Sequence, residues 1–374
     1  MITAIIFIIV LAVLILVHEF GHFIIAKKSG IRVDEFGLGF PPKIVGKKFG
    51  ETEYTLNWIP FGGFVKIFGE TPDDEAEKGA DSSRSLINKN RWIQAAVLVG
   101  GVLFNFLFAW LLISISFFSG VNASSEDYAK YSDKFTDTGV ILASVVAGTP
   151  AADAGLKLDD IIKDVRFATE STSTKALSDG PLNSKKIMAM TVKGQPLLFT
   201  VVRAGQSTTT LVTPKKGIIE NDSGKYAVGI LMADYGRLSL PLHLAIYEGG
   251  MSTVHYIKLV ALGLVEFIGQ AIVGKANYSA VSGPVGIAGY VGDAARAGFS
   301  NLLMFTAIIS INLGVINFFP IPALDGGRLL FVLIEGISRK KIPFKVANTL
   351  NTVFFVLLLL LMAVVTYKDI LKLF

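Results

Sequence analysis

The feature that most constrains this chain is a long apolar run that ends in a pair of histidines. Residues 2–17 are uncharged and almost wholly apolar, and they lead directly into His18-Glu19-Phe20-Gly21-His22. Positions i and i+4 lie on the same face of a helix, so His18 and His22 can bind one metal ion. Glu19 would lie beside that metal without being a ligand, where it can accept a proton from a water molecule. The pattern therefore predicts a catalytic metal site.

The competing interpretation is chance, because the same five-residue pattern occurs in soluble helices that bind no metal. A charged side chain at mid-membrane costs at least about 2.5 kcal/mol on insertion scales, so residues of this kind are usually functional. The chain is 52% hydrophobic and 17% charged, which indicates a membrane protein with some soluble part. Its net charge of +5 is small and dispersed, which argues against a nucleic-acid partner. Cysteine is absent, so a metal must be held by His, Asp, Glu or Asn.

The charges around the first helix predict its direction in the membrane. No basic residue precedes the apolar run, as a signal peptide would require, and Lys27, Lys28 and Arg32 follow it. This distribution places the amino terminus outside and the far end of the helix in the cytoplasm. At 1.5 Å per residue, His18 lies about 25 Å along the helix, close to the cytoplasmic edge of a membrane core of about 30 Å.

Residues 33–69 do not have a helical pattern. Residues 36–42 form a turn-rich apolar loop in our interpretation, and residues 53–59 and 63–68 form two short strands around Pro60-Phe61-Gly62. Such a membrane-associated β-hairpin must pack against helices or face a wet cavity. It is either a purely structural hairpin or an edge that pairs with an extended substrate, for which Gly63, Phe64 and Val65 are the candidate contacts.

The polar composition of residues 71–91 predicts a cytoplasmic loop. A second apolar helix is predicted to follow, from about Trp92 to Ser119. Asn105 lies within this helix. A membrane asparagine commonly forms hydrogen bonds between helices, and the alternative is that Asn105 contacts the substrate.

Residues 121–240 change to a soluble mixture with strand-like segments. A strand at 139–146, a short helix that begins near Thr149-Pro150 and ends at Gly155, and a second strand at 157–165 can be identified. This segment resembles a bacterial PDZ domain, closed in the permuted order by a strand at 226–231. A PDZ domain offers a groove that can bind the carboxyl terminus of a peptide.

The last third of the chain contains two further predicted spans, at about 302–321 and 346–365, with basic residues at 328–345 marking a cytoplasmic loop between them. Residues 256–274 are apolar but interrupted by charges, and we interpret them as an interfacial helix. His243 and His255 precede or begin that segment and are interpreted as surface histidines. The predicted fold is a polytopic α-helical membrane protein with four transmembrane helices, a membrane-associated β-hairpin and an inserted α/β PDZ domain. Both termini and the PDZ domain are expected outside.

The third span ends at Asn317-Phe318-Phe319-Pro320-Ile321-Pro322-Ala323-Leu324-Asp325-Gly326-Gly327. The two prolines and two glycines of this segment interrupt the helix near the carboxylate of Asp325. Non-helical backbone at membrane depth must be buried in protein or face a cavity. Asp325 alone would fit a simple Asp-Gly turn. However, a catalytic zinc typically has three protein ligands, and Asp325 is expected at the depth of His18 and His22.

These motifs together resemble the site-two protease family of intramembrane zinc metalloproteases, in particular its bacterial RseP-like members. The resemblance implies zinc-dependent cleavage of membrane-spanning, single-span substrates that another protease has already trimmed, often anti-sigma factors, in the lipid bilayer of the bacterial inner membrane. It implies ligand roles for His18, His22 and Asp325, a general base in Glu19 and a substrate contact in Asn317. The second span has Gly101-x-x-x-Asn105 without the proline that many relatives carry, and one PDZ domain fits where some relatives have two.

Three parts are therefore expected: a membrane part at 1–120, the PDZ domain at 121–240, and a membrane part at 241–374. Two other functions are considered. An inactive PDZ-bearing membrane receptor would not need the complete set of ligands and base. A metal transporter would be expected to show internal repeats and polar residues in several spans, and neither is found.

Overall fold

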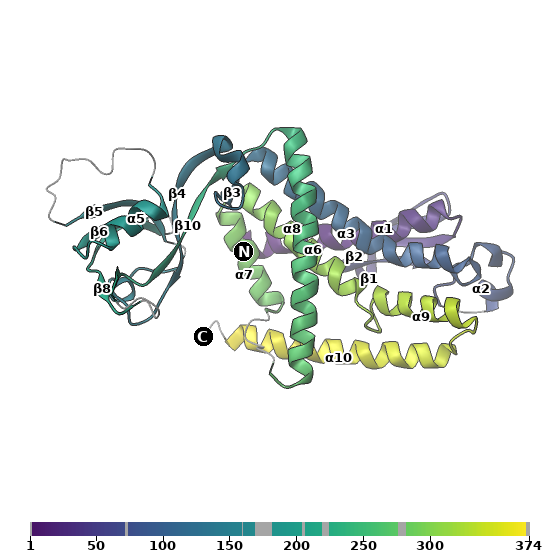
Figure 1. The fold of residues 1–374 in the computed structure, drawn as a ribbon. Helices are drawn as coiled ribbons and strands as arrows, with labels where there is room; N and C mark the ends of the chain where they lie inside the picture. Colours follow the sequence, from purple (N-terminus) through teal and green to yellow (C-terminus); the bar gives the residue numbers. More distant parts are fainter. Residues whose placement is uncertain are drawn as a thin grey trace. The chain divides into compact units, whose positions relative to one another are not determined.

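The computed structural model describes residues 2–71, 74–158, 160–168, 182–203, 206–218, 224–275 and 282–371. The chain separates into two compact units. Unit 1 comprises Met1–Phe117 and Leu242–Phe374, and unit 2 comprises Phe118–Pro241. The fold is shown in Figure 1.

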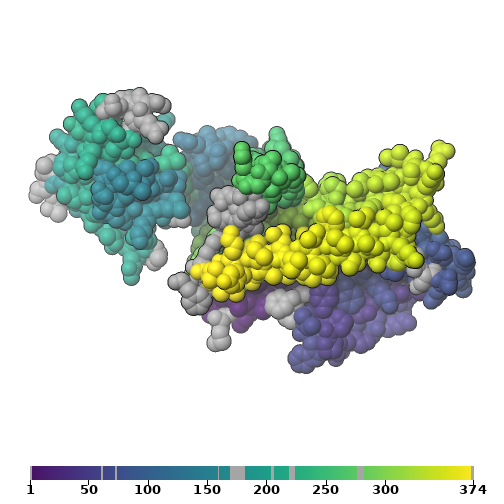
Figure 2. Space-filling view, turned by 90° about the horizontal axis from the view of Figure 1, so that it is seen from below, coloured from purple at the N-terminus to yellow at the C-terminus, as the bar shows by residue number. Residues whose placement is uncertain are grey.

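Unit 1 is built on long apolar helices. Within the described residues, five helices are long and apolar enough to cross a membrane: α1 (Ile2–Lys28), α3 (Arg91–Ser119), α6 (Leu242–Ile272), α8 (Phe299–Phe318) and α10 (Phe344–Leu371). That is one more than the four predicted spans, because α6 extends over the whole segment that we interpreted as interfacial. Much of their surface is apolar and exposed, as expected where lipid is the solvent. Figure 2 shows α10 uncovered along one face of unit 1.

The ends of four helices gather around the short helix α7 (Pro284–Arg296). Its Gly286 N–H donates to Asp369 near the end of α10, at 2.8 Å, and its Gly292 packs on Thr3 at the start of α1. The end of α3 contacts the start of α8, where the Ser116 hydroxyl donates to a backbone carbonyl at 3.2 Å. Helices α1, α3, α8 and α10 therefore run alternately up and down between two common ends.

Helix α6 differs from these four in direction. In Figure 1 it runs across the direction of α3 and α10. Its first turns contact α3, where Trp110 Nε1 donates to the carbonyl of Ile246 at 2.8 Å. Gly249 packs against Ser114 nearby. Both contacts lie toward the α7 end of α3, so α6 begins at that end of the helix bundle.

The segment after α8 is a helix rather than the predicted loop of basic residues. The helical conformation is interrupted at residues 319–324, and α9 (Asp325–Ser338) begins with Asp325 in its first turn. Ala323 is held in this break by its N–H, which donates to Asn351 of α10 at 3.0 Å. Arg91 at the start of α3 forms an ion pair with Glu335 at 2.6 Å, so the start of α3 lies beside the last turns of α9.

The sheet of unit 1 corrects the predicted hairpin. Strand β1 (Val33–Phe49) includes residues 36–42, which we had interpreted as a loop. Strand β2 (Thr52–Ile67) includes the first predicted strand and residues 63–67 of the second. Residues 33–40 pair with 63–67 on one side and with 53–59 on the other, and 43–49 fold back along 52–57. The glycines in 36–42 suggested turns, but Gly37 lies under the Phe64 ring where a side chain would collide. Glycine within a strand often marks such a close approach.

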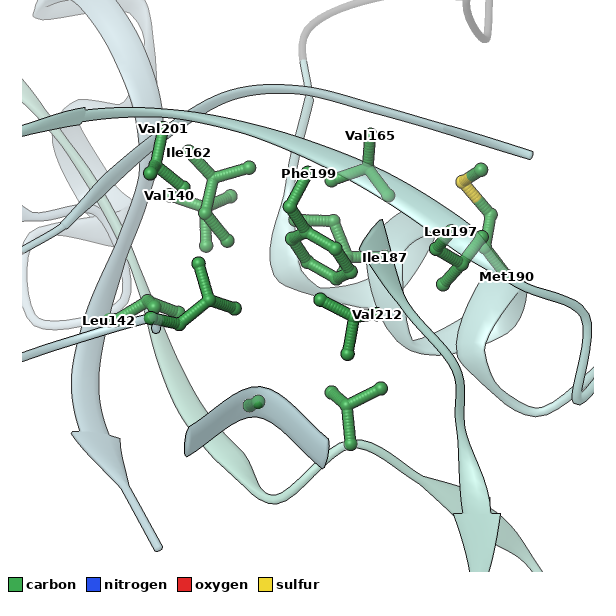
Figure 3. Packing of buried hydrophobic residues seen from close by; sticks show 13 residues of the cluster. Val140, Leu142, Ile162, Val165, Ile187, Met190, Leu197, Phe199, Val201 and Val212 are labelled. Carbon is green, nitrogen blue, oxygen red and sulfur yellow. The ribbon is translucent and has the colours of Figure 1, made fainter. Parts of the chain in front are cut away.

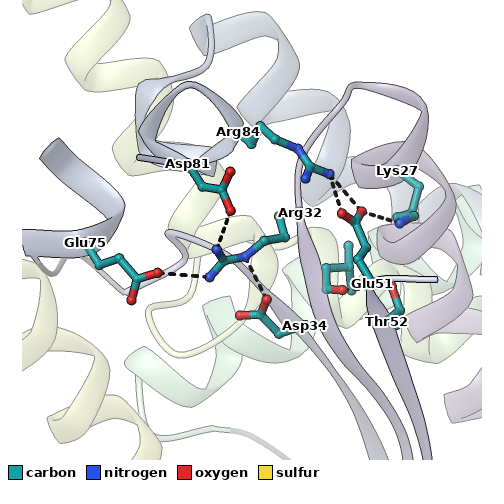
Figure 4. Close-up of polar contacts among 9 residues, drawn as sticks. Lys27, Arg32, Asp34, Glu51, Thr52, Glu75, Asp81 and Arg84 are labelled. Carbon is teal, nitrogen blue, oxygen red and sulfur yellow. Dashed lines mark hydrogen bonds and ion pairs between the residues drawn. The ribbon is translucent and has the colours of Figure 1, made fainter. Parts of the chain in front are cut away.

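Ion pairs attach this sheet to the end of α1 and to the polar segment that follows (Figure 4). Glu51, in the turn between the strands, accepts from Lys27 at 2.5 Å and from Arg84 at 2.7 Å. These hydrogen bonds hold the pKa of the Glu51 carboxyl below its ordinary value. Arg32 contacts three further carboxylates, those of Asp34, Glu75 and Asp81. The polar segment itself holds α2 (Asp74–Lys78) and two short 3-10 turns, Ser82–Arg84 and Leu86–Asn88.

Unit 2 is a six-stranded antiparallel sheet with the strand order β3-β10-β4-β5-β6-β7. Its strands are β3 (Val121–Ser124), β4 (Phe135–Val145), β5 (Ile161–Phe167), β6 (Leu197–Arg203), β7 (Gln206–Val212) and β10 (Ile230–Leu238), with a small ladder of β8 (Lys215–Lys216) and β9 (Tyr226–Ala227). The described residues of the unit also form a 3-10 turn (Ala129–Lys134) and two helices, α4 (Pro150–Asp153) and α5 (Ser184–Thr191). Its main core cluster consists of apolar side chains, with Phe199 near Ile187 and Val212 (Figure 3).

Candidate metal centre

Three residues separated by most of the chain meet at one point in unit 1. His18 and His22 lie one turn apart on α1, and Asp325 begins α9. The Nε2 atoms of the two histidines are 3.3 Å apart. Asp325 Oδ2 is 3.1 Å from His18 Nε2 and 3.2 Å from His22 Nε2. All three predicted ligands are therefore brought together.

The size of this triangle fits a zinc ion. Two ligand atoms held at 2.0–2.1 Å from a tetrahedral zinc lie about 3.3–3.4 Å apart. The three separations of 3.1–3.3 Å are close to that value. Both histidine side chains are 10% exposed and Asp325 is 20% exposed, so the triangle is largely shielded and has one more accessible corner. Two histidines and a carboxylate are a common ligand set for a catalytic zinc.

Close contact between α1 and α3 makes room for the two imidazole rings. Gly21 packs on Gly100, and side chains at either position would overlap the backbone of the other helix. A methyl group at Gly101 would overlap the ring of His22. Small residues let membrane helices approach closely, and here they let α3 form the wall behind the histidines.

Atoms of α3 also contact the far side of both imidazole rings. His22 Nδ1 lies 2.8 Å from the backbone carbonyl of Val97. Asn105 Nδ2 lies 3.0 Å from His18 Nδ1, and the Asn105 side chain has no exposed surface. Asn105 is therefore placed behind His18 and lines neither of the two cavities beside the triangle described next.

Two cavities adjoin the triangle, and Glu19 lines both. The first, of about 280 Å³, is lined by His18, Glu19, Asn317 and Asp325, among others. The second, of about 190 Å³, is lined by Glu19, His22, Asp325 and the strand residues Phe64 and Val65. Gly63 lies close to Ile15 and Glu19 on α1. The structure therefore gathers Glu19, Asn317 and the 63–65 segment beside the three candidate ligands.

Arg328 is a residue of this region to which the sequence did not assign a role. It lies one turn after Asp325 on α9, lines both cavities, and forms an ion pair with Glu70 just after β2. A basic residue three positions after the aspartate was visible in the sequence, but it resembled the start of a cytoplasmic loop. His243 lies in α6 and lines a different, apolar groove between α3 and α6.

Comparison with known proteins gives one consistent result. The model of peptidase family M50 matches residues 6–361. A Clostridium perfringens protein, named provisionally as a zinc metalloprotease, is 38% identical over 96% of this chain and 95% of its own length. The zinc metalloprotease RasP of Geobacillus kaustophilus is 29% identical over 98% of this chain and 97% of its own. The regulator of sigma-W protease RasP of Bacillus subtilis is 29% identical over 100% and 99%.

Proposed function

The chain belongs to peptidase family M50, and we propose that it cleaves membrane-spanning substrates with a zinc ion held by His18, His22 and Asp325. The observation that carries the proposal is the triangle of ligand atoms, with sides of 3.1–3.3 Å, beside a glutamate that lines both adjoining cavities. The names of the relatives, which include zinc metalloproteases, support zinc as the metal.

Each part of the site has a distinct task in this proposal. A zinc ion held by His18, His22 and Asp325 would polarise the scissile carbonyl and increase the acidity of the attacking water. Glu19 accepts the proton of that water and delivers it to the departing amide nitrogen. Asn317 donates hydrogen bonds from its amide to the substrate backbone within the first cavity. A zinc ion held by three protein ligands would keep a further position for water or substrate, which a catalytic zinc site requires.

Segment 63–67 of β2 supplies the edge for an extended substrate. Within the described residues it pairs with 33–40 on one side and with no other strand on its second side. Phe64 and Val65 line the same cavity as Glu19 and His22. A substrate strand added to this edge would bring its backbone to the ligands, because strand addition fixes a peptide by main-chain hydrogen bonds.

The proposed substrates are single-span membrane proteins already trimmed by another protease. A relative named a regulator of sigma-W protease supports membrane regulators of sigma factors, the anti-sigma factors, as members of this class. A cleft inside a helix bundle suits a transmembrane segment because the substrate backbone must unwind away from lipid to reach the site.

For the topology we propose that α1, α3, α8 and α10 span the bacterial inner membrane and that α6 lies on its outer surface. Basic residues collect at one end of the bundle: Lys27 and Lys28 end α1, Arg91 begins α3, and Lys345 lies in the first turn of α10. This bias supports a cytoplasmic position for that end. Helix α6 begins near the opposite end of α3, and α7, which follows it, lies at that same end. Both termini and unit 2 are then outside.

Unit 2 is proposed to be the PDZ domain. A strand, the short helix α4, a further strand and α5 precede β10, which returns to pair with β4 as the permuted order requires. We propose that it acts as a size filter for substrates that retain a large outer domain. The alternative is capture of a peptide carboxyl terminus beside Val228-Gly229-Ile230.

The function is tested by incubating the purified protein in liposomes with tagged single-span substrates. Cleavage should stop when a zinc chelator is added and return with zinc. Glu19→Gln should retain zinc but lose about 10²–10⁴-fold in rate, because a general base is removed. Glu266→Gln, on the exposed surface of α6, is the matched control. Cleavage that is insensitive to the chelator, or a Glu19→Gln variant at the wild-type rate, would refute the mechanism.

The topology is tested with single introduced cysteines, since the chain has none. Cysteines at His243 and Lys275, before and after α6, should react with an impermeant reagent from the same side. Those at Lys340 and Lys216 should react from opposite sides. Labelling of His243 and Lys275 from opposite sides would make α6 a fifth span and would overturn the proposed topology.

The filter is tested by replacing residues 125–235 with a short linker. If unit 2 filters by size, the shortened protein should cleave untrimmed substrates. If unit 2 captures carboxyl termini, the shortened protein should cleave trimmed substrates more slowly and still refuse untrimmed ones. Zinc content measured in parallel establishes that the metal site has formed.

A further inference from the structure

The two histidines are supported in different ways from α3. His22 Nδ1 faces a backbone carbonyl, that of Val97, at 2.8 Å. A carbonyl oxygen only accepts hydrogen bonds, so Nδ1 of His22 carries the proton. The lone pair is then on Nε2, which is the atom that faces Asp325 and the other histidine. Val97 thus fixes the tautomer that a metal ligand requires.

His18 faces a side chain in the corresponding position. Asn105 Nδ2 is 3.0 Å from His18 Nδ1, which makes the amide a donor and leaves the lone pair on Nδ1. The amide oxygen of Asn105 is buried and has no hydrogen-bond partner among the described residues. An unpaired buried acceptor costs about 1–3 kcal/mol. A half-turn of the amide group would exchange its nitrogen and oxygen within the same space.

The requirement of a metal determines which way the amide faces. If His18 binds a metal through Nε2 in its neutral form, its proton is on Nδ1 and needs an acceptor. The amide oxygen of Asn105 is the atom that can provide one, and the amide nitrogen then takes the buried position at which the oxygen had no partner. The position of Asn105 is itself held, because the Ser310 hydroxyl of α8 donates to its backbone carbonyl at 2.8 Å.

We propose that Asn105 is a positioning residue whose amide oxygen accepts the Nδ1 proton of His18 and so holds Nε2 toward the metal. The proposal rests on the zinc site proposed above. It gives a specific function to the hydrogen bond between helices that the sequence predicted as the commoner role of Asn105, in place of a contact with substrate. Residues 97 and 105 of α3, two turns apart on either side of Gly101, then act as a matched pair behind the two histidines.

The test compares zinc affinity among variants of the purified full-length protein, by competition with a chromophoric chelator. Asn105→Leu removes both donor and acceptor and should weaken zinc binding by about 10–100-fold, as loss of a hydrogen-bond partner of a metal-bound histidine typically does. Asn105→Asp keeps only acceptor atoms and should restore affinity close to that of the wild type. Asn312→Leu, in which a membrane asparagine that bonds within its own helix is replaced, is the matched control.

The absorption spectrum of the cobalt-substituted protein gives a second measurement that does not depend on cleavage. Asn105→Leu should change the ligand-field bands, whereas Asn105→Asp and Asn312→Leu should not. Asn105→Ala makes the same comparison if leucine prevents folding. The proposal is overturned if loss of the Asn105 side chain leaves zinc affinity unchanged, or if Asn105→Asp binds zinc more weakly than Asn105→Leu, since the amide would then act as the donor. A wild-type protein that binds no zinc would instead refute the proposed function.

Discussion

Unit 1 and unit 2 differ in the polarity of the side chains that they bury. The main core cluster of unit 2 consists of apolar side chains, and the described part of the unit buries a single charge, that of Asp160. The helices of unit 1 turn apolar side chains outward and bury polar ones around the metal centre, including His18, His22, Asn105 and Ser310. In the proposed topology, water surrounds unit 2 and lipid surrounds the membrane-spanning helices of unit 1. Burial of apolar surface therefore stabilises unit 2, whereas close packing and satisfied hydrogen bonds hold the site of unit 1.

The largest effect that would separate the two units is expected from Phe199→Ala. This fully buried ring lies within the core of unit 2, and its loss should lower the free energy of unfolding by about 3–5 kcal/mol. Hydrogen–deuterium exchange of the full-length protein should accelerate in peptides of 118–241 and stay unchanged in α1 and α3. An equal loss of zinc affinity would contradict the independence of the two units.

Gly101→Val is the opposite experiment, in unit 1. The new side chain would overlap the His22 ring and separate α3 from α1. A displacement of about 1 Å in an active site can cost 10²-fold, so we expect a loss of at least about that size in zinc affinity and cleavage. Gly263→Val on α6, where no atom would meet the added group, is the control. A Gly101→Val protein with wild-type zinc content would show that close packing of these helices is unnecessary.

The one buried charge in the part of unit 2 that the structure describes provides a smaller test. Asp160 is fully buried and forms a two-point ion pair with Arg203, at 2.6 and 2.7 Å. Removing one partner of a buried pair costs about 3–5 kcal/mol, but Arg203 is 44% exposed, so Arg203→Met should cost about 2 kcal/mol. Exchange in 118–241 would measure this loss. An unchanged exchange rate in Arg203→Met would mean that water hydrogen-bonds to Asp160 as well as the guanidinium of Arg203 does.

The same pair predicts how the stability of unit 2 depends on pH. Burial alone would raise the pKa of Asp160, but the hydrogen bonds from Arg203 and from the Lys157 N–H outweigh it, so the pKa lies below its ordinary value of 3.8. The contribution of Asp160 is therefore fully present above that value and is lost as the pH falls toward the lower pKa of the folded state. Arg203→Met should flatten this acid dependence.

The smallest effect is expected at the ion pairs that attach the sheet of unit 1 to α1. Glu51→Gln weakens contacts to Lys27 and Arg84, whose side chains are 32% and 37% exposed. Partly exposed pairs contribute about 0–1 kcal/mol, so exchange in 33–67 should rise only slightly. A large loss of zinc affinity in this variant would show that the sheet, and not only α3, holds the site in place.

Sequence alone could predict the parts of the site that depend on local spacing. The i, i+4 separation of His18 and His22 fixes their common face on a helix, and the apolar run fixes the membrane. Membership of the protease family, predicted from the same motifs, is confirmed by the family match over residues 6–361. Asp325 was named as a ligand from its expected depth, and its role remains a proposal although the structure places it 3.1 Å from His18.

Only the tertiary structure shows which atoms of α3 contact the Nδ1 atoms of the two histidines and how strands β1 and β2 pair. A backbone carbonyl such as that of Val97 leaves no mark in a sequence, because every residue has one. The role of Asn105 depends on the contact between α1 and α3, which the sequence pattern leaves undetermined. Residues 33–67 were assigned the wrong pairing because glycines that permit close packing in a strand are the same glycines that permit turns. Local periodicity determines elements, whereas contacts between distant elements depend on packing that only the folded chain defines.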